Sequence, residues 1–189
     1  RDDHPGVEVV LVAADELESS RDGLLRGDFD LAFSYNSETD EYIEAIAVVE
    51  DSWVILTRRD SAIASLDRPD FTVLDQQDLV AWARRWRGQA ELEDGWARRG
   101  IAPKIVYRTD DNLALQRLVA AGLGHACIGR VAASRAVDPA LTWLEPDEAT
   151  AQRTIALCYA RHRPVTATAR TLITAIRSQG ALRSGGSGR

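Results

Sequence analysis

His125 and Cys127 are the residues whose types and spacing come closest to those of a reactive site. They stand two apart in the apolar stretch "HACIG", so on a strand their side chains would share one face. A metal site would need further ligands, and a cysteine nucleophile would need a base oriented by a third group. The sequence contains no HExxH and no CxxC motif. We therefore interpret Cys127 as a packing residue and predict no catalytic residue, no metal site and no cofactor.

A second set of polar and aromatic residues follows the apolar runs that are typical of strands. In open α/β sheets, ligands bind outside the carboxyl ends of the strands. That rule selects these ligand-binding candidates: Glu16, Ser34, Tyr35, Trp82, Thr109, Asp110, Gly124 and His125. Other roles stay open, since Ser34 could bond its own loop, Thr109 could cap a helix and Trp82 could belong to a core.

The charge of the ligand stays open as well. Helix N-termini follow two of the predicted strand ends, and such N-termini favour an anionic group. However, Glu16, Glu18, Asp110 and Asp111 already place negative charge there. A neutral or cationic ligand is therefore an alternative to a small organic acid.

Strand-like runs alternate with runs of helical spacing along the chain. The predicted strands cover residues 7–14, 29–35, 53–57, 80–83, 102–109, 125–129, 141–145 and 154–161. The predicted helices cover residues 16–27, 88–101, 110–122, 130–137 and 166–180, with glycines at several of their ends. This alternation predicts an α/β fold, and the strand–helix–strand units at 7–35 and 102–128 indicate parallel sheets.

Composition limits the class of protein further. A chain of 189 residues with 45% hydrophobic residues can form one domain, or two lobes, with a core. Its net charge of -6 argues against nucleic acid as a direct partner of this chain. No apolar run approaches the ~20 residues of a membrane span, and two cysteines without a pairing pattern fit a reduced cytoplasm. Several arginines and tryptophans lie close together in the sequence, and we interpret them as a solvated helix face. They are Trp82, Arg84, Arg85, Trp86, Arg87, Trp96, Arg98 and Arg99.

Three blocks of sequence resemble, in this order, the effector-binding domain of LysR-type bacterial transcriptional regulators. They read "HPGVEVVLVAA…LLRGDFDLAFSY", "VVEDSWVILTRRDSAIA" and "GIAPKIVYRTDDNLALQRLVAAGLGHACIG". The closing "RTIALCYARHRPVTATARTLITAIRS" is similar to the family's last strand and helix. The chain departs from the family at Gly129-Arg130, where a proline is common, and at His125, where a small or β-branched residue is usual.

The resemblance implies a two-lobed fold like that of type 2 periplasmic-binding proteins, each lobe a mostly parallel sheet flanked by helices. Lobe I would comprise residues 1–76 and 153–179, lobe II residues 77–152, and residues 180–189 a flexible tail. A small-molecule effector would bind in the cleft between the lobes. The family's winged helix-turn-helix and the first strand of lobe I would precede residue 1.

The function that follows is effector sensing by a cytoplasmic homodimer or homotetramer, which contacts DNA only through that N-terminal domain and contacts no membrane. Two alternatives share the scaffold. An exported solute-binding protein would need a signal peptide, and an enzyme would need a clustered catalytic set.

Overall fold

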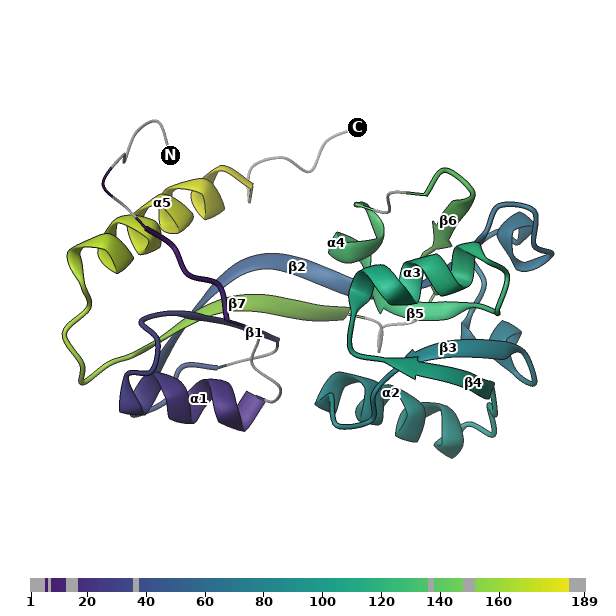
Figure 1. Ribbon diagram of the computed structural model, residues 1–189, viewed down its shortest axis with the longest axis horizontal. Coiled ribbons are helices and arrows are strands. Elements are labelled where there is room, and N and C mark those ends of the chain that lie inside the picture. Colours follow the sequence, from purple (N-terminus) through teal and green to yellow (C-terminus); the bar gives the residue numbers. More distant parts are fainter. Residues whose placement is uncertain are drawn as a thin grey trace. The chain divides into compact units, whose positions relative to one another are not determined.

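The computed structural model describes residues 6, 8–12, 17–35, 38–135, 138–147 and 152–183. The chain divides into two compact units (Figure 1). Unit 1 comprises Arg1–Glu50 and Thr154–Arg189, and unit 2 comprises Asp51–Arg153. The two units are described separately below.

Unit 1 combines a small sheet with two helices. Its elements are α1 (Leu17–Arg26), β1 (Ala32–Tyr35), the first half of β2 (Ile43–Arg58), most of β7 (Gln152–Ala160) and α5 (Ala167–Arg183). In the sheet, β7 lies between β1 and β2. The buried side chains that form the core come from α1, β2 and β7, and they are Leu24, Ile43, Ala156, Cys158 and Ala160.

Three predictions for unit 1 need correction. Residues 8–12, predicted as part of a strand over 7–14, are irregular and exposed, and Leu11 is 90% exposed. The parallel unit predicted for residues 7–35 is not formed by the described residues, because residues 8–12 are no strand and the described partner of β1 is β7, in antiparallel pairing. A β-branched run favours a strand only where another strand offers its edge, and none of the described strands pairs with residues 8–12. Helix α5 also continues past Gly180 to Arg183, since a glycine permits a helix to end but does not force it.

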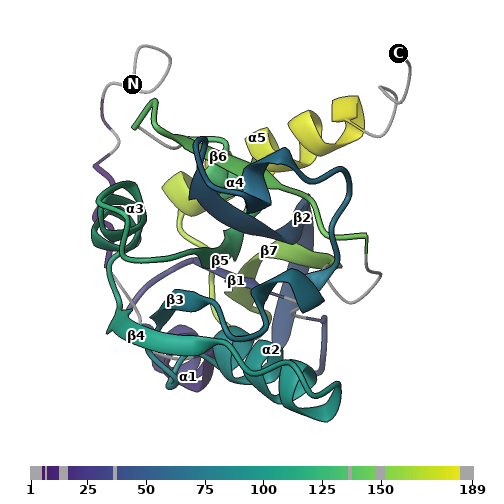
Figure 2. The same cartoon turned by 90° about the vertical axis from the view of Figure 1, so that its right-hand side faces the viewer.

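Unit 2 contains the strand–helix–strand units that the sequence predicts. Its elements are the second half of β2, β3 (Asp78–Trp82), α2 (Arg87–Arg98), β4 (Lys104–Thr109), α3 (Asn112–Ala120), β5 (Ala126–Gly129), α4 (Arg130–Ala133) and β6 (Leu141–Leu144). Strands β3 and β4 are parallel, and a parallel bridge between Leu79 and His125 sets β5 in the same direction. Helix α3 packs on all three strands (Figure 2). The second half of β2 pairs antiparallel with β5 and β6.

The boundary between the units differs from the predicted one. The sequence predicted lobe I up to residue 76, whereas residues 51–76 belong to unit 2. The predicted short strand at 53–57 is part of a single strand, β2, which runs through Glu50 and Asp51 without a break. Pairing with β5 and β6 holds the second half of β2 in unit 2, and the paired residues lie 70 or more positions apart in sequence.

The core of unit 2 lies on both faces of β2. Ile55 packs with Phe71, Trp96 and Cys127 on one face, which confirms the packing role expected for Cys127. Val54 and Leu56 face a second cluster under α3, because side chains alternate along a strand. The mixture of strands and helices confirms the α/β class. Parallel pairing, however, is described only for β3 with β4 and for the bridge to β5.

Candidate ligand-binding site

The parallel strands of unit 2 end together at one edge of the sheet. We call this the carboxyl edge and define it by Trp82, Thr109 and Gly129, the last residues of β3, β4 and β5. Trp82 and Thr109 are register partners, and the backbone N–H of Ala83 donates to the Thr109 carbonyl at 3.1 Å. The structure therefore brings together two of the predicted site residues at the position where α/β sheets bind ligands.

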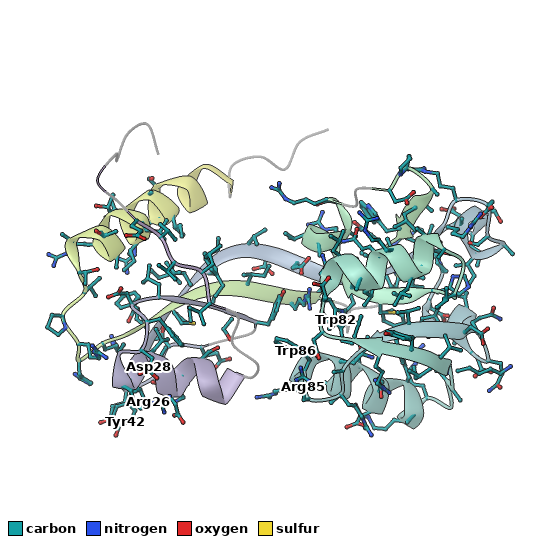
Figure 3. All side chains as sticks on the ribbon, in the orientation of Figure 1. Arg26, Asp28, Tyr42, Trp82, Arg85 and Trp86 are labelled. Carbon is teal, nitrogen blue, oxygen red and sulfur yellow. The ribbon has the colours of Figure 1, made fainter. Side chains whose placement is uncertain are left out.

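Aromatic and charged side chains surround this pair. The rings of Trp82 and Trp86 meet edge to face, with centroids 6.4 Å apart. The indole Nε1 of Trp86 donates to Asp110 Oδ1 at 2.8 Å, and Arg85 forms an ion pair with the same carboxylate. Figure 3 shows Trp82, Arg85 and Trp86 next to one another in unit 2. Asp110 is thus part of the carboxyl edge, as predicted.

Sequence reasoning did not include Trp86 and Arg85 among the ligand-binding candidates. It interpreted both as parts of a solvated helix face. Arg85 is exposed, but its charge is paired with Asp110 from the loop after β4, 25 residues away. The signal that could have found Trp86 is its spacing, four residues after Trp82 and just before the first residue of α2.

The N-terminus of α3 already holds a carboxylate from the chain. Asp111 Oδ1 accepts the backbone N–H of Ala114 at 2.7 Å and so caps the helix. Thr109 Oγ1 accepts the backbone N–H of Asp111 at 3.1 Å. Asp111, and not Asp110, is therefore the helix cap. The anion position that the helix dipole creates at this strand end is filled internally.

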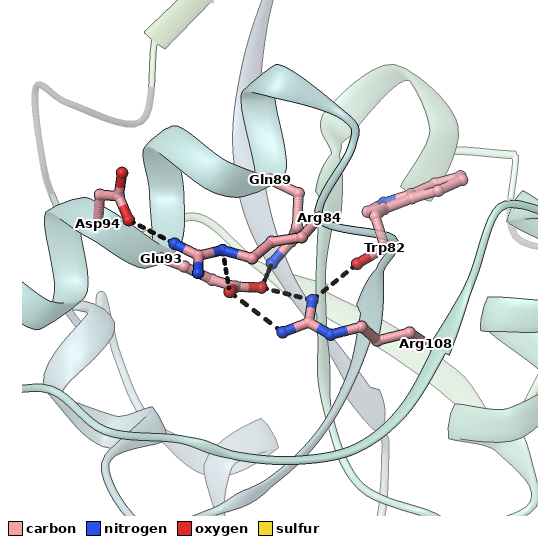
Figure 4. Close-up of polar contacts among 6 residues, drawn as sticks. All are labelled: Trp82, Arg84, Gln89, Glu93, Asp94 and Arg108. Carbon is pink, nitrogen blue, oxygen red and sulfur yellow. Dashed lines mark hydrogen bonds and ion pairs between the residues drawn. The ribbon is translucent and has the colours of Figure 1, made fainter. Parts of the chain in front are cut away.

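A polar network anchors the end of β3 to α2 and β4 (Figure 4). Arg108 donates to Glu93 at 2.7 and 3.1 Å and to the Trp82 carbonyl at 2.9 Å. Gln89 Nε2 donates to Glu93 at 2.8 Å, and Arg84 pairs with Glu93 and with Asp94. Burial would raise the pKa of Glu93, but the hydrogen bonds from Arg108 and Gln89 outweigh it and hold the pKa below its usual value.

Gly124 and His125 lie at the opposite end of the strands, which we call the amino edge. His125 precedes β5 and bridges to Leu79, three residues before Trp82. At about 3.3 Å per residue this separates His125 from the carboxyl edge by roughly 10 Å. The structure therefore places Gly124 and His125 at the other end of the strands from Trp82 and Thr109, and their role in ligand binding stays a prediction.

The side chain of His125 is engaged at the amino edge. Its Nδ1 lies 2.7 Å from Thr57 Oγ1, which lies 2.8 Å from Ser61 Oγ. Thr57 is fully buried. Burial lowers the pKa of His125, and the negative charge of Asp78 opposes this only in part. Burial thus favours the neutral form of the imidazole.

The remaining candidates belong to unit 1. Ser34 is 7% exposed and Tyr35 is 51% exposed, and their side chains lie on opposite faces of β1. Glu16 lies outside the described residues. Within the described residues, no three His, Cys, Asp or Glu side chains are grouped so as to hold a metal ion. None of the helices in the described part of the chain combines the length and apolar character that a membrane crossing requires.

The two units form a mixed α/β fold, and LysR substrate binding domains have the type 2 periplasmic-binding-like fold. The profile of the LysR substrate binding domain matches residues 1–181. The chain therefore belongs to this family, the effector-sensing domains of LysR-type transcriptional regulators.

Solved structures agree with this fold. The CcmR regulatory domain of Synechocystis PCC6803, in complex with 2-PG, superposes with a TM-score of 0.81 at 17% identity, covering 95% of this chain and 86% of that chain. The effector binding domain of QuiR, in complex with shikimate, has a TM-score of 0.73 at 17% identity, covering 88% and 78%. The LysR family regulator HinK of Pseudomonas aeruginosa has a TM-score of 0.76 at 19% identity, covering 95% and 62%.

Proposed function

We propose that this domain binds a small-molecule effector at the carboxyl edge of unit 2, with Trp82 and Thr109 at the centre of the contact. The register pairing of these two residues at the strand ends is the observation that carries the proposal. Trp86 and Asp110 would supply an aromatic edge and a hydrogen-bond acceptor. Ser34 and Tyr35 are further candidates from unit 1. The complexes of two family relatives with 2-PG and shikimate support a small molecule as the class of ligand.

We further propose that effector binding controls DNA binding by the full-length regulator, through a DNA-binding module outside this chain. The bound molecule would shift an equilibrium between conformations and would not be chemically changed. The regulator would act in the cytoplasm, where its promoter DNA lies. We propose a homodimer or homotetramer, which size-exclusion chromatography with light scattering tests directly; a monomer at high micromolar concentration would contradict it.

A thermal-shift screen of small metabolites tests the binding proposal. A ligand at a hundred times its Kd stabilises the folded state by about 2.7 kcal/mol. For a chain of this size that corresponds to a rise of roughly 5–11 °C in Tm. Hits should then be titrated by calorimetry, so that affinity is measured independently of stability.

Substitution of two comparable tryptophans tests whether a ligand found in the screen binds at the carboxyl edge. Trp82 and Trp143 both lie partly buried against the same core cluster, on β3 and β6 respectively. Trp82→Leu should abolish or strongly weaken binding, whereas Trp143→Leu should leave the Kd unchanged despite a similar loss of packing. Equal Kd values for the two variants would exclude the carboxyl edge as the site.

A further inference from the structure

Helix α3 carries two buried side-chain acceptors to which no described residue donates a hydrogen bond. They are Asn112 Oδ1 and Gln116 Oε1. Gln116 as a whole is only 4% exposed. A buried acceptor without a donor costs more free energy than an average hydrogen bond contributes, so folded proteins rarely contain one. Two such oxygens on one helix therefore indicate a place where a donor from outside the chain binds.

These two oxygens belong to the first turns of α3, at the carboxyl edge. Asn112 is the first residue of α3 and follows Thr109, the last residue of β4, by three positions. Gln116 lies one turn further on, on the same side of the helix. Long side chains on a helix lean towards its N-terminus, which directs the amide of Gln116 back to the turn that holds Asn112. We therefore expect both acceptors beside the strand ends, where α/β sheets bind ligands.

The polar groups of this turn favour a ligand that donates hydrogen bonds. Asp111 caps the first turn of α3, and the residue before it is Asp110, whose carboxylate pairs with Arg85. The oxygens of Asn112 and Gln116 add two further acceptors. A ligand carboxylate would meet lone pairs at these oxygens, whereas an O–H or N–H group would meet acceptors.

We propose that Asn112 and Gln116 determine the specificity of the effector site by accepting hydrogen bonds from O–H or N–H groups of the effector. The effector is then a compound with neighbouring donors, either neutral like a vicinal diol or cationic like a primary amine, and not a simple carboxylic acid. This inference rests on the proposed function, because it assigns a ligand class to the same edge.

Replacement of two buried glutamines tests the state of Gln116 without an effector. Gln89 on α2 is also buried, but its Nε2 donates to Glu93 at 2.8 Å. Gln89→Leu should therefore lower Tm by roughly 3–12 °C, because a hydrogen bond to a charged group is lost. Gln116→Leu should leave Tm unchanged or raise it, because it removes a polar group without a partner from a buried position. Equal losses of Tm in the two variants would overturn the proposal.

Three small probes test the ligand class on the folded chain by NMR. Ethylene glycol offers O–H donors, methylammonium chloride offers N–H donors, and 1,2-dimethoxyethane has the oxygens of the glycol without its donors. Ethylene glycol or methylammonium should shift the side-chain amide signals of Asn112 and Gln116 in a saturable manner, with sodium chloride as the control for ionic strength. Gln116→Leu should weaken this binding, as seen at Asn112, by about 2–12-fold.

The response to each probe decides the outcome. A shift with ethylene glycol supports a neutral effector, and a shift with methylammonium supports a cationic one. An equal response to 1,2-dimethoxyethane would mean that the amides do not select donors, and it would overturn the proposal. The absence of a saturable response to both donors would overturn it as well.

The tryptophan variants separate this inference from the proposed function. If a metabolite from the screen loses affinity in Trp82→Leu but not in Gln116→Leu, the carboxyl edge is the site and the ligand class assigned here is wrong. If that metabolite keeps its affinity in Trp82→Leu, both proposals fail.

Discussion

The two ends of the parallel strands in unit 2 are built in opposite ways. At the carboxyl edge, Asp111 and Asp51 occupy the backbone N–H groups of Ala114 and Val131, while the Trp82–Trp86 pair remains partly exposed. At the amino edge, a tight turn brings the backbone against β3, and His125 donates its backbone N–H to the Asp78 carbonyl at 2.9 Å. Helices begin after the carboxyl edge, and their first N–H groups need acceptors from outside the helix, whereas the turn at Gly124 lies directly against the Asp78 carbonyl.

The substitution with the largest expected effect on stability tests how tightly the backbone is packed at the amino edge. Gly124 has φ +142°, and a Cβ there would overlap the carbonyl of Asp78, which cannot move without loss of the bridge between β3 and β5. Gly124→Ala should therefore destabilise the chain by about 2–5 kcal/mol, because backbone strain and overlap add. Urea unfolding measures this loss.

Gly100→Ala is the matched control for that variant. Gly100 has φ +72°, and nothing lies within 4 Å of its added Cβ. Its loss should reflect backbone strain alone, about 1–2 kcal/mol. Equal losses for the two variants would show that the amino edge has room after all.

A substitution with a smaller expected effect on stability tests whether the polar network around Glu93 anchors the carboxyl edge. Glu93→Gln removes the charge that Arg108 and Gln89 stabilise and should cost about 1–3 kcal/mol at neutral pH. The pKa of Glu93 is lowered in the folded state, so its contribution is complete above the unfolded pKa of about 4.3 and is lost as pH falls through the folded value. Urea unfolding at neutral and acidic pH should show the gap between wild type and variant narrowing in acid.

Glu91 provides the control for this prediction, because it pairs with Arg87 on the same helix but is exposed. Glu91→Gln should cost about 0.5 kcal/mol or less. A loss in Glu93→Gln no greater than this would mean that the network in Figure 4 does not anchor the edge.

The smallest effect concerns the pH response of the amino edge. The pKa of His125 is lowered, so the folded state is fully stabilised above the unfolded pKa of about 6.5 and loses stability as pH falls from there towards the folded value. Thr57→Val removes the partner of Nδ1 and should cost about 1 kcal/mol at neutral pH. Equilibrium unfolding across this pH range measures both effects.

Thr142→Val, on the partly exposed surface of β6, should leave the pH profile unchanged. Replacing His125 by Asn keeps a polar side chain without a titrating ring and should flatten the profile below neutral pH. A wild-type profile without any slope attributable to His125 would contradict the lowered pKa.

Local patterns were sufficient for much of the fold. The apolar spacing in 110–122 predicted α3, because a helical pattern depends on residues only a few positions apart. The run at 7–14 was predicted by the same reasoning and is not a strand over residues 8–12, because a strand depends on a partner that the pattern does not contain.

The site was predictable only in part, for a related reason. The positions of Trp82, Thr109 and Asp110 at the carboxyl edge were predictable, because Trp82 and Thr109 end strands and Asp110 follows one directly. His125 lies at the other end of the strands, because the turn at Gly124 leads into β5 and so precedes the strand rather than ending it. Arg85 was missed because its partner, Asp110, follows a different strand.

Sequence by itself determined the α/β class, the family resemblance and the order of most elements, since these depend on spacing and on neighbours along the chain. Tertiary structure alone decided which groups meet across long separations. Asp51 and Arg153 are 102 residues apart, and only the course of β2 and β7 brings their charges together over Trp53. A buried ion pair requires both partners in one geometry, and that geometry is a property of the folded chain and not of either residue.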